Sequence, residues 1–201
     1  MLSIIEAAGW PIWFILFTSF VALAIIGERF WSLRNSRVAP REVLPATIRE
    51  FQARGVTPEL IAKLQAGPLI GRIFAAALLN ERGSREAIKD SVEDAGRAVG
   101  LELERFLNTL GTIATVSTLL GLFGTIVGMI EIFGSQTAGG SNPLQLAHGI
   151  SVALYNTAFG LIVAIPSMIF YRHFRATIDS LVVEMEQQAI KLVDFAHGER
   201  Q

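Results

Sequence analysis

Two long apolar segments constrain what this chain can fold into more than any other feature of its sequence. They cover residues 109–133 and 147–171, and neither has a charged side chain near its middle. Each is long enough to cross the ~30 Å hydrocarbon core of a bilayer, for which a helix needs about 20 mostly apolar residues. Each nevertheless keeps a threonine near its centre, Thr125 in the first and Thr157 in the second. The two segments are therefore predicted to be membrane-spanning helices that carry hydroxyl groups at depth.

A third apolar block runs from about Trp10 to Phe30, close to the N-terminus. A cleaved signal peptide is the competing interpretation. However, the leader contains Glu6 but no Lys or Arg, and Glu28-Arg29 stands where a cleavage site would need small residues. We therefore expect a retained membrane helix. Because 51% of the side chains are apolar and they gather into three blocks, the chain is predicted to be an all-α polytopic membrane protein with three transmembrane helices.

The basic residues predict the orientation of the spans in the membrane. Arginines from Arg29 to Arg41 follow the first span, and Arg172 and Arg175 follow the third, whereas the link between the second and third spans has no charge. Positive flanks stay on the cytoplasmic side, so the N-terminus is predicted to be periplasmic and the C-terminus cytoplasmic. The predicted segments are an N-terminal segment with the first transmembrane helix (1–30), a cytoplasmic helical domain (31–108), the second transmembrane helix (109–133), a periplasmic loop (134–146), the third transmembrane helix (147–171) and a cytoplasmic C-terminal helix (172–201).

The predicted cytoplasmic regions have helical patterns of two kinds. Short helices are expected at 42–54, 58–66 and 69–82, between prolines and glycines, and Ser84 is a suitable N-cap for the helix that follows them. From Ile88 onward, apolar residues recur at steps of three or four and continue without a break into the second span.

A similar stripe, from Ile178 to Ala196, follows the third span. The second and third membrane helices are therefore expected to extend into long cytoplasmic helices. Such stripes can be covered within one chain or by a neighbouring subunit. Three spans with long cytoplasmic extensions favour a homo-oligomer.

The composition argues against several classes of function. The chain has no cysteine and only three scattered histidines, so we expect no metal site. No nucleophile with a nearby base and no phosphate-binding loop is recognisable, so we expect no catalytic residue, no cofactor and no enzyme. The net charge of −1, without a basic and aromatic cluster, gives no reason to expect nucleic-acid binding.

Small and hydroxyl-bearing residues are frequent in the second span, and two explanations compete for them. Threonines can donate to the carbonyl four residues earlier, and small residues allow membrane helices to pack closely. We assign this role to three glycines of the span, Gly121, Gly124 and Gly128. It is also the more common explanation for Thr112, Thr115 and Thr118.

Thr125 and Thr157 differ from the other hydroxyl residues in depth. If Gly121 and Phe159 mark the centres of their spans, Thr125 lies ~6 Å and Thr157 ~3 Å toward the periplasm. The two hydroxyls could then share one layer of a helical bundle and form an ion pathway. They could equally pack without any such role.

Three further polar residues have open interpretations. Glu131 lies ~15 Å from the centre of its span. It faces lipid headgroups and water, or it forms an acidic periplasmic mouth that gathers cations, with His148 as a neighbour. Asn156 points about 100° away from Thr157 and is expected to bond to a neighbouring helix.

These segments resemble a known family. GLFGTIVGMIEIF, followed after a short loop by GISVALYNTAFGLIVAIPSMIFY, is similar to the MotA/TolQ/ExbB proton-channel family. The Glu28-Arg29 pair after the first span and the long insertion that follows it are also similar. The resemblance covers nearly the whole chain and is strongest to the ExbB branch, with the TolQ branch next.

The resemblance implies a pentamer around the membrane helices of a smaller, single-span partner of the ExbD or TolR type. That partner would supply a membrane aspartate, and the complex would use the proton-motive force to drive a TonB-like or TolA-like protein that acts on the outer membrane. The pore threonines of the family correspond to Thr125 and Thr157. Members of the ExbB and TolQ branches commonly have a glutamate five residues before the second threonine, where this chain has Val152.

The sequence therefore predicts a proton-channel or stator subunit, ExbB-like in its role in TonB-dependent transport, whose titrating carboxylate comes from another chain. A TolQ-like role in outer-membrane integrity, a passive membrane scaffold and a MotA-like stator that turns a rotor are the alternatives.

Overall fold

The computed structural model describes residues 9–134, 143–196 and 198 of the chain. Most of the predicted 134–146 loop lies outside these residues, as does the leader before Gly9. Within the described ranges every regular element is an α-helix, which agrees with the predicted fold class. The helices are divided between two compact units, which we describe separately.

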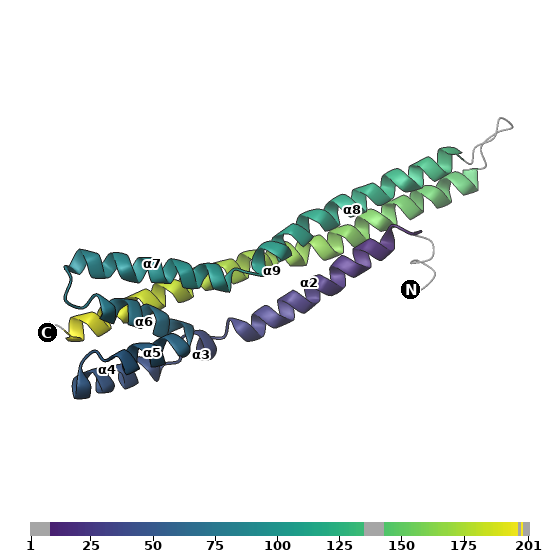
Figure 1. Cartoon of the computed structure of the whole chain (residues 1–201). Helices are drawn as coiled ribbons and strands as arrows, with labels where there is room; N and C mark the ends of the chain where they lie inside the picture. Colours follow the sequence, from purple (N-terminus) through teal and green to yellow (C-terminus); the bar gives the residue numbers. More distant parts are fainter. Residues whose placement is uncertain (1–8, 135–142, 197, 199–201) are drawn as a thin grey trace. The chain divides into compact units, whose positions relative to one another are not determined.

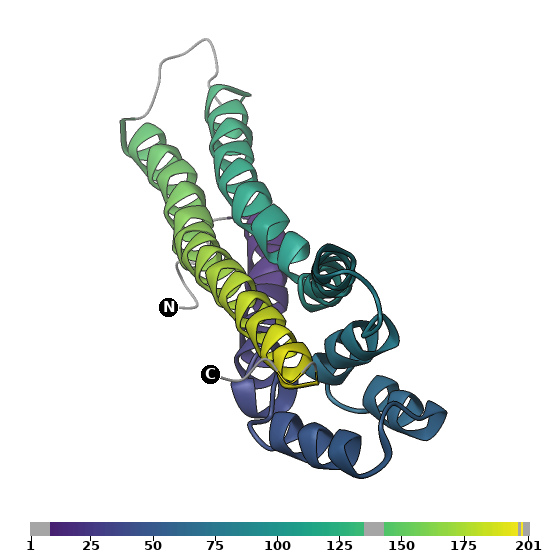
Figure 2. The ribbon, with the colours of Figure 1, turned by 90° about the vertical axis from the view of Figure 1, so that its left-hand side faces the viewer.

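The first unit, here called the membrane unit, consists of the described residues among 1–28 and 106–173. It contains most of α2 (Ile12–Ser32), all of α8 (Leu107–Gly134) and the first part of α9 (Pro143–Ala196). All three helices are long and apolar enough to cross a membrane. Figures 1 and 2 both show α8 and the first part of α9 side by side, running in opposite directions.

The second unit, here called the polar unit, consists of residues 29–105 and the described residues from Phe174 onward. It contains α7 (Arg85–Leu103), the last part of α9 and four shorter helices, which are α3 (Asn35–Val38), α4 (Val43–Arg54), α5 (Pro58–Ala66) and α6 (Leu69–Leu79). The predicted short helices are therefore confirmed, although α6 ends three residues earlier than expected. The predicted N-cap is also confirmed, because the hydroxyl of Ser84 accepts a hydrogen bond from the Ala87 amide at 3.2 Å.

The polar unit has an apolar core that matches the predicted stripes. Ile88, Val92, Val99 and Leu103 of α7 are buried, as are Ile178, Leu181, Met185, Ala189 and Leu192 of α9. Helix α6 adds Ile70, Ile73, Phe74, Ala77 and Leu78. Because α5 and α6 are too short to be stable alone, this packing is what holds them in helical form.

The passage from the α7 stripe into the second span differs from the prediction. We expected an unbroken helix, but α7 ends at Leu103 and α8 begins at Leu107. The Nη1 atom of Arg29, a buried residue, donates to the Leu103 carbonyl oxygen at 2.7 Å. A side chain from a distant part of the sequence thus satisfies a carbonyl at the helix end, which local periodicity could not reveal. In contrast, α9 is continuous over 54 residues and passes through Pro166.

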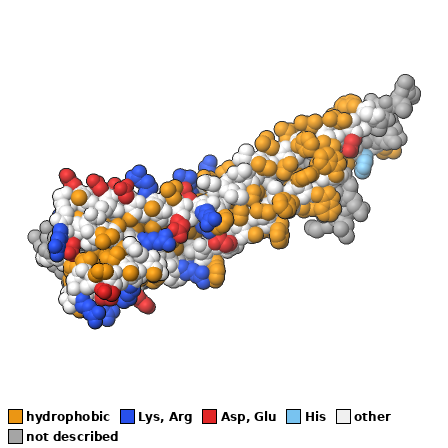
Figure 3. Space-filling model, viewed as in Figure 1, with side chains coloured by type: hydrophobic (Ala, Val, Ile, Leu, Met, Phe, Trp, Pro, Cys, Tyr) orange, Lys and Arg blue, Asp and Glu red, His pale blue; other side chains and the backbone are white. Residues whose placement is uncertain are grey.

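The surfaces of the two units differ in composition. On the face shown in Figure 3, apolar side chains cover the membrane unit, whereas charged side chains interspersed with apolar ones cover the polar unit. In the membrane unit large apolar residues of all three helices are exposed, among them Phe17, Phe20, Leu122, Ile130 and Ile162. Exposed apolar area of this extent on spanning helices is suited to lipid or to other membrane helices.

Candidate functional site

The candidate site is built on a close contact between α8 and α9 in the membrane unit. A Cβ atom placed on Gly160 would lie 2.6 Å from the Ser117 carbonyl oxygen and 2.9 Å from the Gly121 Cα. One placed on Gly124 would lie 2.5 Å from the Asn156 Cβ, and one on Gly128 would lie 3.3 Å from the Ala153 Cβ. The predicted packing role of the α8 glycines is therefore confirmed, because any side chain there would push the two helices apart.

Thr157 lies at the point of closest approach. Its Oγ1 donates to the Gly121 carbonyl oxygen at 3.3 Å, so the hydroxyl joins α9 to the backbone of α8. The residue is half-buried. Since a hydroxyl has two acceptor lone pairs in addition to its single proton, the Thr157 oxygen can still accept a hydrogen bond from water or a partner side chain.

Thr125 lies on α8, one turn away from Gly121. Its Oγ1 donates to the Leu122 carbonyl oxygen of its own helix at 2.6 Å, and the residue is half-buried. Because Thr157 is level with Gly121, four residues at 1.5 Å each separate the two threonines by ~6 Å along the helix axis. The two hydroxyls thus lie within about one helical turn of each other in depth.

Three further threonines of α8 bond to their own helix. Thr112 donates to Asn108 at 2.9 Å, Thr115 to Gly111 at 3.4 Å and Thr118 to Ala114 at 3.2 Å, each to the carbonyl oxygen four residues earlier. These are the bonds expected of threonines in a membrane helix.

Sequence reasoning did not single out a buried hydroxyl pair between α2 and α8. Ser117 is fully buried, and its Oγ donates to Thr18 Oγ1 at 3.2 Å. Thr18 in turn donates to the Ile15 carbonyl oxygen at 2.9 Å. The only signal in the sequence was a hydroxyl residue in each of two apolar spans, which does not reveal that the two would meet.

Asn156 is buried in the α8–α9 contact, where its side chain packs against Gly124. Its Nδ2 donates to the Val152 carbonyl oxygen on the same helix at 3.3 Å. Asn156 thus contacts α8 by packing and donates one hydrogen bond within α9.

Glu131 and His148 lie near the ends of α8 and α9 that adjoin the undescribed link. Both are exposed, and they are brought to a similar level because Ile132 packs against Gly149. No carboxylate lies deeper in either of these two spans. Val152 occupies the position at which the resemblance would lead one to expect a glutamate, and its side chain is half-buried. The membrane unit thus offers hydroxyls, but no group that titrates near neutral pH, to its interior.

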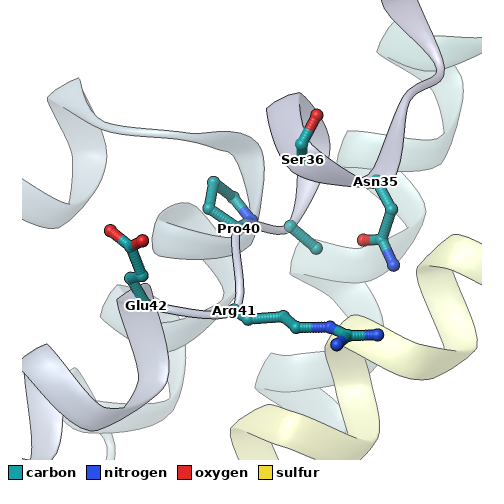
Figure 4. Close-up of a pocket in the computed structure, with 6 residues that line it drawn as sticks. Asn35, Ser36, Pro40, Arg41 and Glu42 are labelled. Carbon is teal, nitrogen blue, oxygen red and sulfur yellow. The ribbon is translucent and has the colours of Figure 1, made fainter.

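The polar unit contains hollows of its own, among them one of about 470 Å³ between α7 and α9 that is lined by charged residues such as Arg97, Arg175 and Asp179. Within the described residues, no three His, Asp or Glu side chains lie close enough together to hold a metal ion. A hollow of about 450 Å³ lies at the turn between α3 and α4. Figure 4 shows the Arg41 and Glu42 side chains pointing in different directions there, so they do not form a paired charged cluster.

Comparison with known proteins connects this geometry to a family. The model of the MotA/TolQ/ExbB proton channel family matches residues 65–187, which include α7, α8, the α8–α9 contact and most of α9. The matched region thus contains both candidate threonines.

Individual relatives agree with the family match. The chain is 38% identical over 168 residues to "Putative biopolymer transport protein ExbB-like 3" of Synechocystis sp., with 79% of this chain and 77% of the relative covered. It is 30% identical to "Biopolymer transport protein exbB1" of Vibrio cholerae, with 81% and 74% covered. It is also 30% identical to "Tol-Pal system protein TolQ" of Pseudomonas aeruginosa, with 80% and 68% covered. The chain is a membrane protein that belongs to the MotA/TolQ/ExbB proton channel family.

Proposed function

We propose that the chain is an ExbB-like proton-channel subunit of an inner-membrane complex, which uses the proton-motive force to drive TonB-dependent transport across the outer membrane. One observation carries the proposal. In an otherwise apolar membrane unit, the Thr157 hydroxyl is held at the α8–α9 contact, one turn in depth from the Thr125 hydroxyl. The names of the Synechocystis and Vibrio relatives support the ExbB-like role.

In this proposal the two threonines line the ion pathway but do not carry the proton. A threonine hydroxyl does not ionise at physiological pH, and a proton moving through the membrane needs a group that does. The carboxylate therefore comes from a partner, a single-span subunit of the ExbD or TolR type with a membrane aspartate. Thr157 can then accept a hydrogen bond from that aspartate in its protonated form, or from a water beside it, because its oxygen keeps its acceptor lone pairs.

In this proposal several copies of the chain together enclose the ion pathway, which one chain alone cannot do. A single membrane unit exposes apolar side chains on all three helices. A homopentamer around the partner's helix would cover part of this surface and turn the α8 and α9 threonines into a ring. In each cycle the complex would pass protons and move a TonB-like or TolA-like protein.

The available energy limits how this motion is driven. A potential of 100 mV supplies about 2.3 kcal/mol for each charge that crosses. Mechanical work on an outer-membrane partner therefore needs several protons in each event. A ring of identical subunits around one partner would allow such repeated steps.

The arginine-rich flanks of the first and third spans support a periplasmic N-terminus and a cytoplasmic polar unit. In that orientation Glu131 faces the periplasm and would form the mouth of the pathway. An exposed carboxylate there would raise the local proton concentration through its negative potential.

Two other functions are compatible with parts of the evidence. The 30% identity to the Pseudomonas TolQ protein equals that to the Vibrio protein, which supports a TolQ-like role in outer-membrane integrity. A passive scaffold is supported by the bonds that Thr112, Thr115 and Thr118 make to their own helix, which packing alone would explain.

The test is energised transport in cells that carry Thr125→Val or Thr157→Val, with assembly followed in parallel. The proposal predicts that either variant assembles with its partner but loses transport, because valine keeps the shape and removes the hydroxyl. Full transport in both variants would favour the scaffold. Rescue of TonB-dependent uptake rather than of outer-membrane integrity in a deletion strain would separate the ExbB-like role from the TolQ-like one.

A further inference from the structure

A groove in the membrane unit is not explained by helix packing. It lies between α8 and α9, has a volume of about 350 Å³ and is lined by Thr115 and Thr118 among apolar side chains. Two buried alanines, Ala114 and Ala164, form part of its floor. At ~30 Å³ for each water molecule, the groove has room for about ten.

The groove lies on the same helix face as the candidate threonines. Thr118 precedes Thr125 by seven residues, which is close to two full turns of an α-helix. Leu161 of the groove follows Thr157 by four residues, which also places it on the same face. The groove therefore begins one turn from the Thr157 hydroxyl and leads toward Leu107, the N-terminal end of α8.

The hydroxyls of Thr115 and Thr118 lie at depths between Thr157 and the N-terminal end of α8. Thr118 lies ~4.5 Å and Thr115 ~9 Å from the level of Gly121 at 1.5 Å per residue. If Gly121 marks the middle of a ~30 Å hydrocarbon core, Thr115 is ~6 Å from the edge of that core. Hydroxyls at these depths bridge most of the distance between Thr157 and the polar unit.

Both hydroxyls have the capacity to bind water. Thr115 and Thr118 donate their protons to carbonyl oxygens of α8, at 3.4 and 3.2 Å. Their two oxygen lone pairs therefore remain available to accept hydrogen bonds. Both residues are exposed in the groove rather than covered by α9. Water there would find acceptors along a wall that is otherwise apolar.

We infer that this groove is the water-filled cytoplasmic section of the ion pathway, with Thr115 and Thr118 as the residues that hold its water. The inference rests on the proposed function for its direction, since the ion passes from Thr157 toward the cytoplasm. In this inference the groove is occupied by water molecules, and these carry the proton. An apolar side chain of a neighbouring subunit in the groove is the alternative that the experiment must exclude.

The absence of cysteine from the chain makes the occupant directly measurable. Single-cysteine variants Thr115→Cys and Thr118→Cys are prepared in the full complex, in inverted membrane vesicles that expose the cytoplasmic face. A charged, membrane-impermeant methanethiosulfonate is then added. Val116→Cys is the matched control, because Val116 lies at the same depth and is 37% exposed but does not line the groove.

The inference predicts faster labelling at positions 115 and 118 than at 116. Only the thiolate reacts, and a thiol in apolar surroundings is protonated more strongly. A pKa difference of one unit would give about a tenfold difference in labelling rate. Rates at 115 and 118 equal to the rate at 116 would show a groove filled by lipid or a protein side chain and would overturn the inference.

Proton flux in the same vesicles tests the role of the hydroxyls. Thr118→Val and Thr115→Val are each expected to lower flux by about fivefold, the factor that one hydrogen bond of typical net strength is worth. Thr118→Ser should restore it. Thr112→Val is the chemical control, because Thr112 makes the same kind of bond to its own helix but lies outside the groove.

Failure of this inference can be distinguished from failure of the proposed function by measuring Thr157→Val alongside. Loss of flux in Thr157→Val together with normal flux in Thr115→Val and Thr118→Val overturns the groove assignment and leaves the proposed function in place. Normal flux in all three overturns both. Loss of flux in all three, with rapid labelling at 115 and 118, supports both.

Discussion

The membrane unit and the polar unit use polar groups in opposite ways. In the polar unit, charged side chains pair on the surface, as in Lys63 with Glu50 at 2.5 Å and Arg85 with Asp194 at 3.4 Å. In the membrane unit, hydroxyls donate to backbone carbonyl oxygens, and the middles of the spanning segments 109–133 and 147–171 carry no charge. Exposed ion pairs are worth little to stability, whereas polar groups in a membrane must be satisfied internally. The hydroxyl groups in the middle of the membrane unit therefore form hydrogen bonds but do not take up or release protons near neutral pH.

Two glycines, one in each unit, differ in the kind of atom that a side chain at their position would meet. In the membrane unit a Cβ on Gly160 would meet backbone atoms of α8, which cannot move without separating the helices. In the polar unit a Cβ on Gly96 would overlap the carboxylate end of Glu186, a flexible side chain. Gly160 is thus confined by backbone, whereas Gly96 faces a side chain that can adjust; Gly71 of the polar unit resembles Gly160, because its Cβ would meet the Leu64 backbone.

The largest expected effect is on the Thr157 hydroxyl. Thr157→Val removes the bond to the Gly121 carbonyl oxygen and the acceptor lone pairs at the α8–α9 contact. We expect energised transport to fall to background, while Thr157→Ser retains most of it. Uptake assays with both variants, at matched expression, measure this. Equal loss in the serine and valine variants would show that shape rather than the hydroxyl matters.

The next largest effect is on helix packing. Gly160→Ala should destabilise the membrane unit by about 1–3 kcal/mol, the usual cost of overpacking a tight contact. Thermal unfolding of the purified protein in detergent measures the change.

Two matched variants sharpen that comparison. Gly27→Ala on α2 has nothing within 4 Å of the new Cβ, so it should not lower the melting temperature. Gly96→Ala should cost less than Gly160→Ala because the Glu186 carboxylate can move aside. A larger loss for Gly96→Ala than for Gly160→Ala would contradict the expectation that a flexible side chain makes room more easily than backbone does.

A smaller, pH-dependent effect is expected in the polar unit. Burial, and then the nearby Glu93 carboxylate, raise the pKa of Glu186 above its ordinary value. A raised folded-state pKa means that Glu186 contributes stability at low pH, and that this contribution is lost as pH rises through the folded pKa. The melting temperature of the wild type should therefore fall relative to that of Glu186→Gln between acidic and neutral pH. A constant difference between the two proteins across that range would contradict the shift.

The smallest effect is expected at Glu131. As an exposed carboxylate at the proposed mouth, it acts only through its potential, which salt screens. Glu131→Gln should lower proton flux modestly at low ionic strength and not at high ionic strength. Flux that is unchanged at both ionic strengths would assign Glu131 to the headgroup region.

The sequence predicted the elements well where local patterns determine them. Apolar length located the three spanning helices, and Ser84 predicted the start of α7. The break between Leu103 and Leu107 was missed because no glycine or proline marks it and the satisfying group, Arg29, is 74 residues away. Helix periodicity contains no information about such a distant donor.

The candidate site was predictable only in part for the same reason. Depth along each span singled out Thr125 and Thr157, and glycine spacing indicated close packing. The bond from Thr157 to the Gly121 carbonyl oxygen and the contact of Ser117 with Thr18 depend on which helix faces meet. The groove beside Thr115 and Thr118 likewise exists only once α8 and α9 are placed together.

The central claim is that this chain lines a proton pathway but supplies no carboxylate within the middle of its spans. The group that binds and releases the proton therefore comes from another chain. The most direct test is proton flux into liposomes that contain the purified chain alone or the chain reconstituted with its single-span partner. We predict potential-driven flux only with the partner, and loss of that flux when the partner's membrane aspartate is changed to asparagine. Proton flux through the chain alone, at the rate of the complex, would contradict the claim.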